Sequence, residues 1–101
     1  MLLLHYSSEK LQAEISDIVR KHYSGVATLF FFGSRVSHGK NDRSDIDVGI
    51  LPEKTLSLQT IRAIKDDLNQ IRMLYQIDFV DFSTVSEHFK SIALQQIESI
   101  N

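Results

Sequence analysis

The chain lacks several residue types that define whole classes of protein. It contains no cysteine and no tryptophan, and only one proline and four glycines among 101 residues. Without cysteine the chain can form neither a disulfide framework nor a thiolate zinc site. The formal net charge is only −2, which argues against a protein that binds nucleic acid by broad phosphate neutralisation.

Long hydrophobic runs are also missing. No apolar stretch approaches the roughly 20 residues that a membrane-spanning helix needs. The apolar run near the first methionine is too short for the hydrophobic part of a secretory leader. We therefore expect a cytoplasmic protein that contacts neither a membrane nor nucleic acid directly.

The composition that is present is that of an ordinary soluble domain. Hydrophobic residues make up 43% of the chain and charged residues 24%. A chain of 101 residues has room for one modest core, so residues 1–101 are expected to form a single domain.

Three short apolar runs predict strands, at residues 26–32, 45–51 and 76–82. Pro52 follows the second run and is expected to end that strand. Because side chains alternate between the two faces of a strand, Asp47 shares a face with Asp45 and lies opposite the neighbouring isoleucines and valine.

Helical spacing of apolar residues separates these runs. A first helix is expected after a serine cap at Ser7 or Ser8, and a second over residues 58–74. The polar stretch after the first strand holds at most one further helical turn. A capping box, Thr84-x-x-Glu87, predicts a last helix that buries Phe89 and runs on to the C-terminal isoleucines.

The stretch from the first strand to the second carries the chemistry. Gly33 allows a sharp turn and a close approach of the backbone to a ligand, and Ser34 adds a hydroxyl donor. Asp45 and Asp47 supply hard oxygen ligands of the kind that Mg²⁺ prefers. Clustered carboxylates repel one another, so the pair itself implies a bound cation.

The spacing Gly33-Ser34-x(10)-Asp45-x-Asp47 resembles the signature of the DNA polymerase beta-like nucleotidyltransferases, and the short chain is similar to the minimal nucleotidyltransferases of that superfamily. Four fixed positions recur by chance on the order of once in a thousand sequences of this length. The resemblance implies an α+β fold of the α/β type, with a small mixed three-stranded sheet packed by about four helices. Minimal nucleotidyltransferases typically act as antitoxins for helical HEPN-domain toxins, so a hetero-oligomer is implied.

The resemblance also implies the roles of the site residues. Asp45 and Asp47 would hold two Mg²⁺ ions on the triphosphate of ATP, and a third carboxylate would complete the metal site and help to deprotonate the acceptor hydroxyl. Two positions on the third strand fit it, Asp78 and Asp81, which point to opposite faces; the family pattern favours Asp78.

The phosphates would lie against the turn, with Gly33 and Ser34 on the β- and γ-phosphates and Arg35 as a further contact. The segment after Arg35 departs from the family pattern, because Ser37 stands where many members carry a second arginine. A P-loop is the nearest competing motif, but Asn41 replaces the required serine or threonine after the lysine.

Three functions compete. The first is transfer of AMP to a hydroxyl of the toxin, with tyrosine as the expected acceptor. The second is transfer to a small molecule such as an aminoglycoside, although relatives of that kind usually carry a further helical domain. The third is a non-catalytic antitoxin that neutralises its partner by occlusion.

Overall fold

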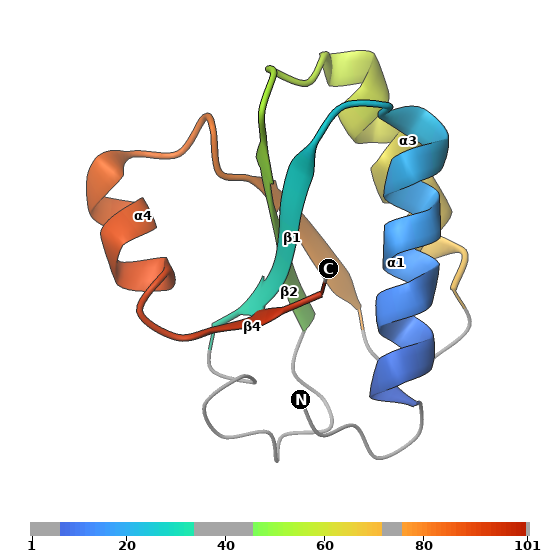
Figure 1. The fold of residues 1–101 in the computed structure, drawn as a ribbon, viewed down its shortest axis with the longest axis horizontal. Coiled ribbons are helices and arrows are strands. Elements are labelled where there is room, and N and C mark those ends of the chain that lie inside the picture. Colours follow the sequence, from blue (N-terminus) through green and yellow to red (C-terminus); the bar gives the residue numbers. More distant parts are fainter. Residues whose placement is uncertain (1–6, 34–45, 72–75, 101) are drawn as a thin grey trace.

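The computed structural model describes residues 7–33, 46–71 and 76–100. The described residues form helices and strands, and Figure 1 shows them as a small sheet with helices on both sides. In chain order the elements are α1 (Ser8–His22), β1 (Ala27–Phe32), β2 (Ile46–Pro52), α3 (Leu58–Asn69), β3 (Ile77–Asp81), α4 (Glu87–Ala93) and β4 (Ile97–Ser99).

The four described strands form one mixed sheet in the order β3-β2-β1-β4. Strand β1 runs antiparallel to both β2 and β4, whereas β2 and β3 are parallel. Helix α3 makes the crossover that a parallel pair requires. The prediction of a mixed α+β fold is confirmed. The sheet has four described strands where three were predicted, and the described residues contain three helices where about four were predicted.

The extra strand comes from residues that were predicted to be helical. Helix α4 ends at Ala93, with Leu94 as its C-cap, and Ile97–Ser99 then pairs with β1. The N–H of Ile100 donates to the carbonyl of Leu29 at 2.9 Å. The pairing satisfies main-chain groups on the outer edge of β1 that would otherwise face solvent.

Two other boundaries differ from the prediction. Helix α3 ends at Asn69, and the remaining predicted residues, 70–74, lie beyond it, with 72–75 outside the described part of the chain. The cap of α4 is Ser86, whose hydroxyl accepts from the N–H of Phe89 at 3.1 Å. Thr84 is not a cap, because its hydroxyl donates to the carbonyl of Asp81. The helical turn considered after residue 33 also lies outside the described residues.

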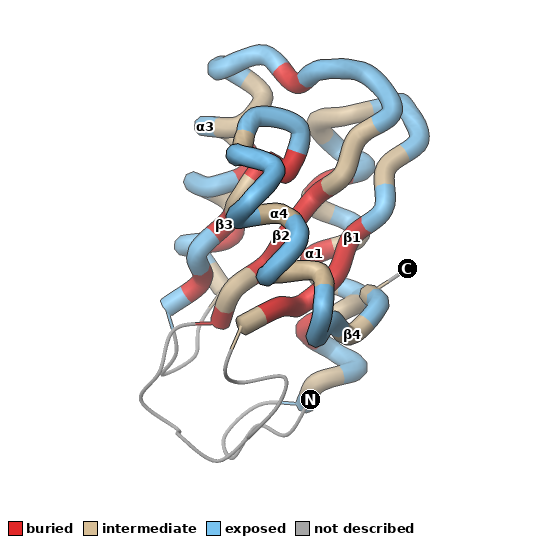
Figure 2. Tube along the Cα trace, turned by 90° about the vertical axis from the view of Figure 1, so that its left-hand side faces the viewer, coloured by how far each residue is buried: buried red, intermediate tan, exposed pale blue. Residues whose placement is uncertain are grey.

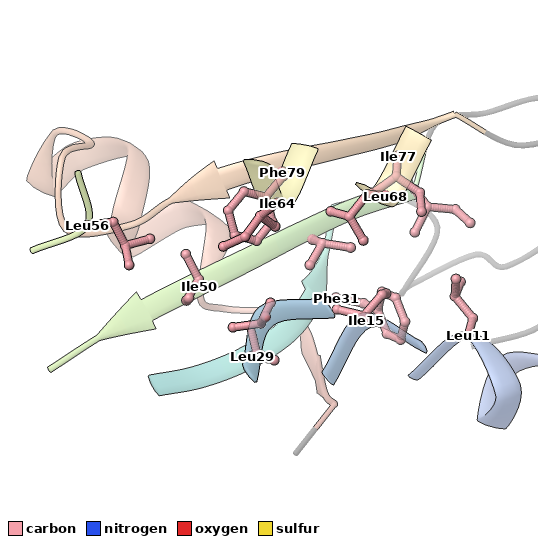
Figure 3. Packing of buried hydrophobic residues seen from close by; sticks show 13 residues of the cluster. Leu11, Ile15, Leu29, Phe31, Ile50, Leu56, Ile64, Leu68, Ile77 and Phe79 are labelled. Carbon is pink, nitrogen blue, oxygen red and sulfur yellow. The ribbon is translucent and has the colours of Figure 1, made fainter. Parts of the chain in front are cut away.

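The two faces of the sheet are covered unequally. Helices α1 and α3 lie together on one face, and α4 lies on the other (Figure 1). Ile46, Val48 and Ile50 point into the first layer, as the alternation in β2 predicted. Figure 3 shows this main core, where residues of α1 and α3 meet the sheet. Its best buried members are Leu11, Ile15, Phe31, Ile46, Val48, Ile50 and Ile64.

The second face carries a smaller aromatic cluster. Phe30 and Phe82 meet edge to face with centroids 5.0 Å apart, and Phe32 packs on Phe82 at the same distance. Gly49 leaves the room for these rings, because a Cβ there would meet Cε1 of Phe82 at 2.7 Å and collide with Phe30. The phenylalanines of β1 are thus core residues.

None of the helices in residues 7–33, 46–71 and 76–100 is long and apolar enough to span a membrane.

The ends of α1 and α3 are joined by a partly buried ion pair. His22 Nε2 lies 2.6 Å from Asp67 Oδ2, and Lys21 Nζ lies 3.4 Å from the same oxygen. The hydrogen bond from His22 lowers the pKa of Asp67 below its ordinary value, and the charge of Lys21 lowers it further.

This ion pair predicts how stability depends on acid. A depressed carboxyl pKa stabilises the fold above the unfolded pKa of about 4, and the stabilisation is lost as the pH falls through the folded value. We expect Asp67→Asn to destabilise the protein at neutral pH. Its free energy of unfolding should also fall less steeply than that of the wild type as the pH is lowered. Thermal unfolding measured from neutral to strongly acidic pH checks this. The control is Asp66→Asn on the exposed side of the same helix, which should leave the dependence of stability on acidic pH as in the wild type.

Candidate active site

Two of the predicted site residues lie side by side in the sheet. The parallel register pairs Asp47 of β2 with Asp78 of β3. Paired residues of neighbouring strands project from the same face, about 4.8 Å apart across the strands. Both carboxylates therefore lie on the face that carries α4, at the same level of the sheet.

Asp81 occupies the opposite face. It is only 7% exposed, and its Oδ1 accepts from the N–H of Ser83 at 2.9 Å and from the hydroxyl of Ser83 at 2.7 Å. Asp81 thus caps the turn after β3 and is not solvated. Its other oxygen, Oδ2, is buried without a hydrogen-bond partner in the described part of the chain.

Gly33 follows the last residue of β1 and lies next to the carboxylate of Asp47. Its φ of +89° lies in the region that favours glycine, and a Cβ at this position would collide with Oδ2 of Asp47. The turn and the carboxylate therefore fit each other only without a side chain at residue 33. Ser34, Arg35 and Asp45 follow in the segment 34–45, which lies outside the described residues.

Asp47 and Asp78 open into a pocket of about 480 Å³ at the β3 edge of the sheet. Five of its residues are consecutive, from Gln76 to Val80, so the pocket follows β3. The others come from β1, β2, α3 and α4, namely Phe32, Asp47, Lys65, Asn69 and Phe89.

Sequence reasoning missed the contributions of two helices to this pocket. Lys65 and Asn69 are four residues apart and so share one face of α3, which is the only signal that the sequence gives. Phe89 was predicted to be buried, yet it remains 42% exposed. One side of its ring packs on Phe82, with centroids 5.7 Å apart, while the ring also lines the pocket.

The donor set fits a divalent cation. Asp47 and Asp78 present carboxylate oxygens to the same pocket, and hard oxygen ligands of this kind suit Mg²⁺. Within the described ranges no three acidic or histidine side chains gather into a complete metal site. Asp45, which the sequence predicts as a further metal ligand, lies outside the described residues.

We expect Gly33→Ala to destabilise the protein by about 1–2 kcal/mol, because alanine disfavours a positive φ. The added Cβ should also displace the carboxylate of Asp47. Urea unfolding measures the first effect. Gly33→Asn separates the two causes, since asparagine tolerates positive φ but brings the same Cβ. It should therefore recover stability and leave Asp47 displaced. Wild-type stability in the alanine variant would contradict the described turn.

Comparisons with known proteins agree with this geometry. The family model described as polymerase beta nucleotidyltransferase matches residues 12–100. The chain is 31% identical over 65 residues to the Haemophilus influenzae protein named "Probable protein adenylyltransferase MntA". That match covers 64% of this chain and spans only 57% of the relative's length.

Solved structures share the fold. One is a complex described as tri-AMPylated Shewanella oneidensis HEPN toxin with MNT antitoxin, with a TM-score of 0.73 and 18% identity. The similarity covers 94% of this chain and 72% of that one. Another is described as a toxin–antitoxin with AMP-PNP and has a TM-score of 0.74 and 20% identity. That similarity covers 89% of this chain and 72% of the other chain. Because the family model matches nearly the whole sequence, the chain belongs to the polymerase beta nucleotidyltransferase family.

Proposed function

We propose that this chain is an adenylyltransferase that moves AMP from ATP, with Mg²⁺, to a hydroxyl of a partner protein. The observation that carries the proposal is the in-register pair of Asp47 and Asp78, which shares a pocket beside the turn at Gly33. The solved complexes of similar fold, one with an AMPylated HEPN toxin and one with AMP-PNP, support a HEPN-type toxin as the partner and ATP as the nucleotide.

Each residue has a defined task in this proposal. Gly33 and Ser34 hold the β- and γ-phosphates, because a turn without a Cβ lets main-chain amides approach an anion closely. Arg35 adds positive charge from the same segment. Asp45, Asp47 and Asp78 would hold two Mg²⁺ ions, which would supply positive charge to neutralise the triphosphate and the charge that develops in the reaction.

The reaction needs one proton acceptor. Asp78 lies at the outer side of the carboxylate pair, on the edge strand, where an acceptor can reach it from solvent. It takes the proton of the acceptor hydroxyl, whose oxygen forms a bond to the α-phosphorus. The bond from that phosphorus to pyrophosphate breaks, so AMP remains on the acceptor and pyrophosphate leaves.

A protein acceptor is favoured by the surface around α4. This helix has no buried residue, and three large apolar side chains on or just after it are exposed. Phe89, Ile92 and Ile97 are 42%, 55% and 43% exposed. Phe89 also lines the pocket, so the apolar surface is continuous with the carboxylate site. Such surfaces commonly mark protein interfaces. Tyrosine is our proposed acceptor residue in a HEPN-type toxin.

The test is to incubate the protein with Mg²⁺, labelled ATP and the protein encoded by the neighbouring gene, and to look for a mass gain of AMP on that protein. The matched variant is Asp45→Ala/Asp47→Ala, which should give no mass gain and should also lose Mg²⁺ affinity in a titration. Neutralisation of a toxin by this variant, together with no transfer by the wild type, would leave only the occlusion function. Unchanged Mg²⁺ affinity would contradict the assignment of the metal ligands.

A further inference from the structure

Strand β3 is an edge strand of the sheet that residues 7–33, 46–71 and 76–100 form. Figure 2 shows it at the left-hand end of the four described strands, where β2 is its neighbour in the strand order. Edge strands normally have a protecting feature, such as a covering segment or a bulge. Here the edge instead borders the pocket that contains the carboxylates.

The register shows which main-chain groups face outward. The N–H of Ile46 donates to the carbonyl of Gln76, and the N–H of Phe82 donates to the carbonyl of Ile50, both at 2.8 Å. Both bonds use even-numbered positions of the third-strand segment. Because main-chain groups alternate between the two sides of a strand, Ile77 and Phe79 direct their N–H and C=O groups away from β2. These groups are the ones with which an additional strand would pair.

An added strand would extend the row of carboxylates. Asp47 and Asp78 are paired across β2 and β3, and a residue paired with Asp78 on the outer side would project from the same face. It would lie about 4.8 Å beyond Asp78, at the normal spacing of strands. A hydroxyl on that residue would thus be next to the group proposed to take its proton.

We infer that the acceptor hydroxyl is presented by an extended segment of the partner protein that pairs with the outer edge of β3. This inference rests on the proposed function and adds the conformation of the partner segment that carries the acceptor hydroxyl. Main-chain pairing gives affinity for any extended segment, while the side chains on each face of the edge determine which sequences fit.

The two faces of the edge differ in chemistry. On the α4 side, Val80 and Phe89 line the pocket next to Asp78, which favours apolar residues two positions from the acceptor. On the α3 side, the exposed Lys65 lines the same pocket, which favours acidic residues directly beside the acceptor. The preferred segment is therefore apolar–acidic–hydroxyl–acidic–apolar.

Two blocked pentapeptides of identical composition test this preference. The first is Val-Asp-Tyr-Asp-Val, and the second exchanges its valines with its aspartates to give Asp-Val-Tyr-Val-Asp. With Mg²⁺ and labelled ATP, we expect kcat/KM for AMP transfer to be about fivefold or more higher for the first peptide, because its valines meet Val80 and Phe89 and its aspartates meet Lys65. Equal rates for the two peptides would contradict the proposed faces of the edge.

A backbone substitution tests the pairing itself. Replacing Phe79 by phenyllactic acid keeps the side chain and changes the outward N–H to an ester oxygen; it also weakens the carbonyl of Asp78 as an acceptor, and the control below carries the same weakening at its own preceding carbonyl. We expect this replacement to lower kcat/KM for the first peptide about fivefold, which corresponds to the loss of one hydrogen bond. The melting temperature should fall by no more than it does in the control variant. The control is the same replacement at Phe82, whose N–H bonds to Ile50, so it should lower the melting temperature and leave transfer by the folded protein unchanged.

Hydrogen exchange separates this inference from the proposed function, because it requires no reaction. The amides of Ile77 and Phe79 should exchange more slowly when the first peptide is added at saturation. Protection without AMP transfer would support edge pairing and contradict the adenylyltransferase. Transfer without protection would support the enzyme and overturn edge pairing. Neither transfer nor protection would overturn both.

Discussion

Replacing Asp47 by asparagine is expected to reduce AMP transfer about a thousandfold, while the folded structure is retained. Asp47 is at the centre of the site: it pairs with Asp78, contacts the turn at Gly33 and lies two residues after Asp45. Loss of one ligand charge removes several kcal/mol of stabilisation from the reacting phosphate, and each 1.4 kcal/mol corresponds to a factor of ten in rate. Single-turnover transfer to the partner protein measures the effect.

The control for this variant is Asp17→Asn. Asp17 is exposed on α1, where it pairs with Arg20, so the variant makes the same change of charge and size far from the pocket. It should keep the wild-type rate. A rate for Asp47→Asn within tenfold of the wild type would exclude Asp47 as a metal ligand, even if the protein still binds its partner.

The second large effect distinguishes the two aspartates of β3. Asp78→Ala is expected to reduce the transfer rate by a factor of 10²–10⁴, in the range for loss of a general base. Its unfolding free energy should change by less than about 0.5 kcal/mol, because Asp78 is exposed. Asp81→Ala should do the reverse: it should keep the rate and lose about 1–3 kcal/mol of stability, since Ser83 loses its buried hydrogen-bond acceptor.

Transfer rate and urea unfolding, measured on both variants, decide between the aspartates. If Asp81→Ala abolished transfer at a temperature where it is folded, the third carboxylate would be Asp81 and not Asp78. The structure makes that outcome unexpected, because Asp81 lies on the opposite face of the sheet from Asp47, among residues that pack against α3.

The parts of the fold that local pattern defines were predicted well. The strands β1, β2 and β3 lie within the three apolar runs to within one residue, because short buried strands leave an uninterrupted apolar signal. Alternation along β2 correctly separated Asp47 from its apolar neighbours. Asp78 and Asp81 lie on opposite faces of β3, as the alternation of side chains predicted.

The C-terminal part was predicted wrongly for a reason that pattern cannot resolve. Ile97 and Ile100 fall at helical spacing after Ile92 and Ala93, so the sequence fits one continued helix. What ends that helix is the open side of β1, which offers main-chain partners to Ile97–Ser99. The N-cap of α4 was misplaced for a similar reason. Thr84 and Ser86 are both residue types that cap helices, but the hydroxyl of Thr84 donates its hydrogen bond to the carbonyl of Asp81.

The sequence by itself determined the residue types of the site and their order along the chain, because a glycine turn and carboxylates at fixed spacing are local features. It also indicated the family. Only the tertiary structure decided that Asp47 and Asp78 lie side by side, since a parallel register depends on how the intervening α3 packs. The same packing placed Lys65 and Phe89 at the pocket and made β3 the edge strand among the described residues. Contacts between distant segments are set by packing of the whole core, which no local pattern encodes.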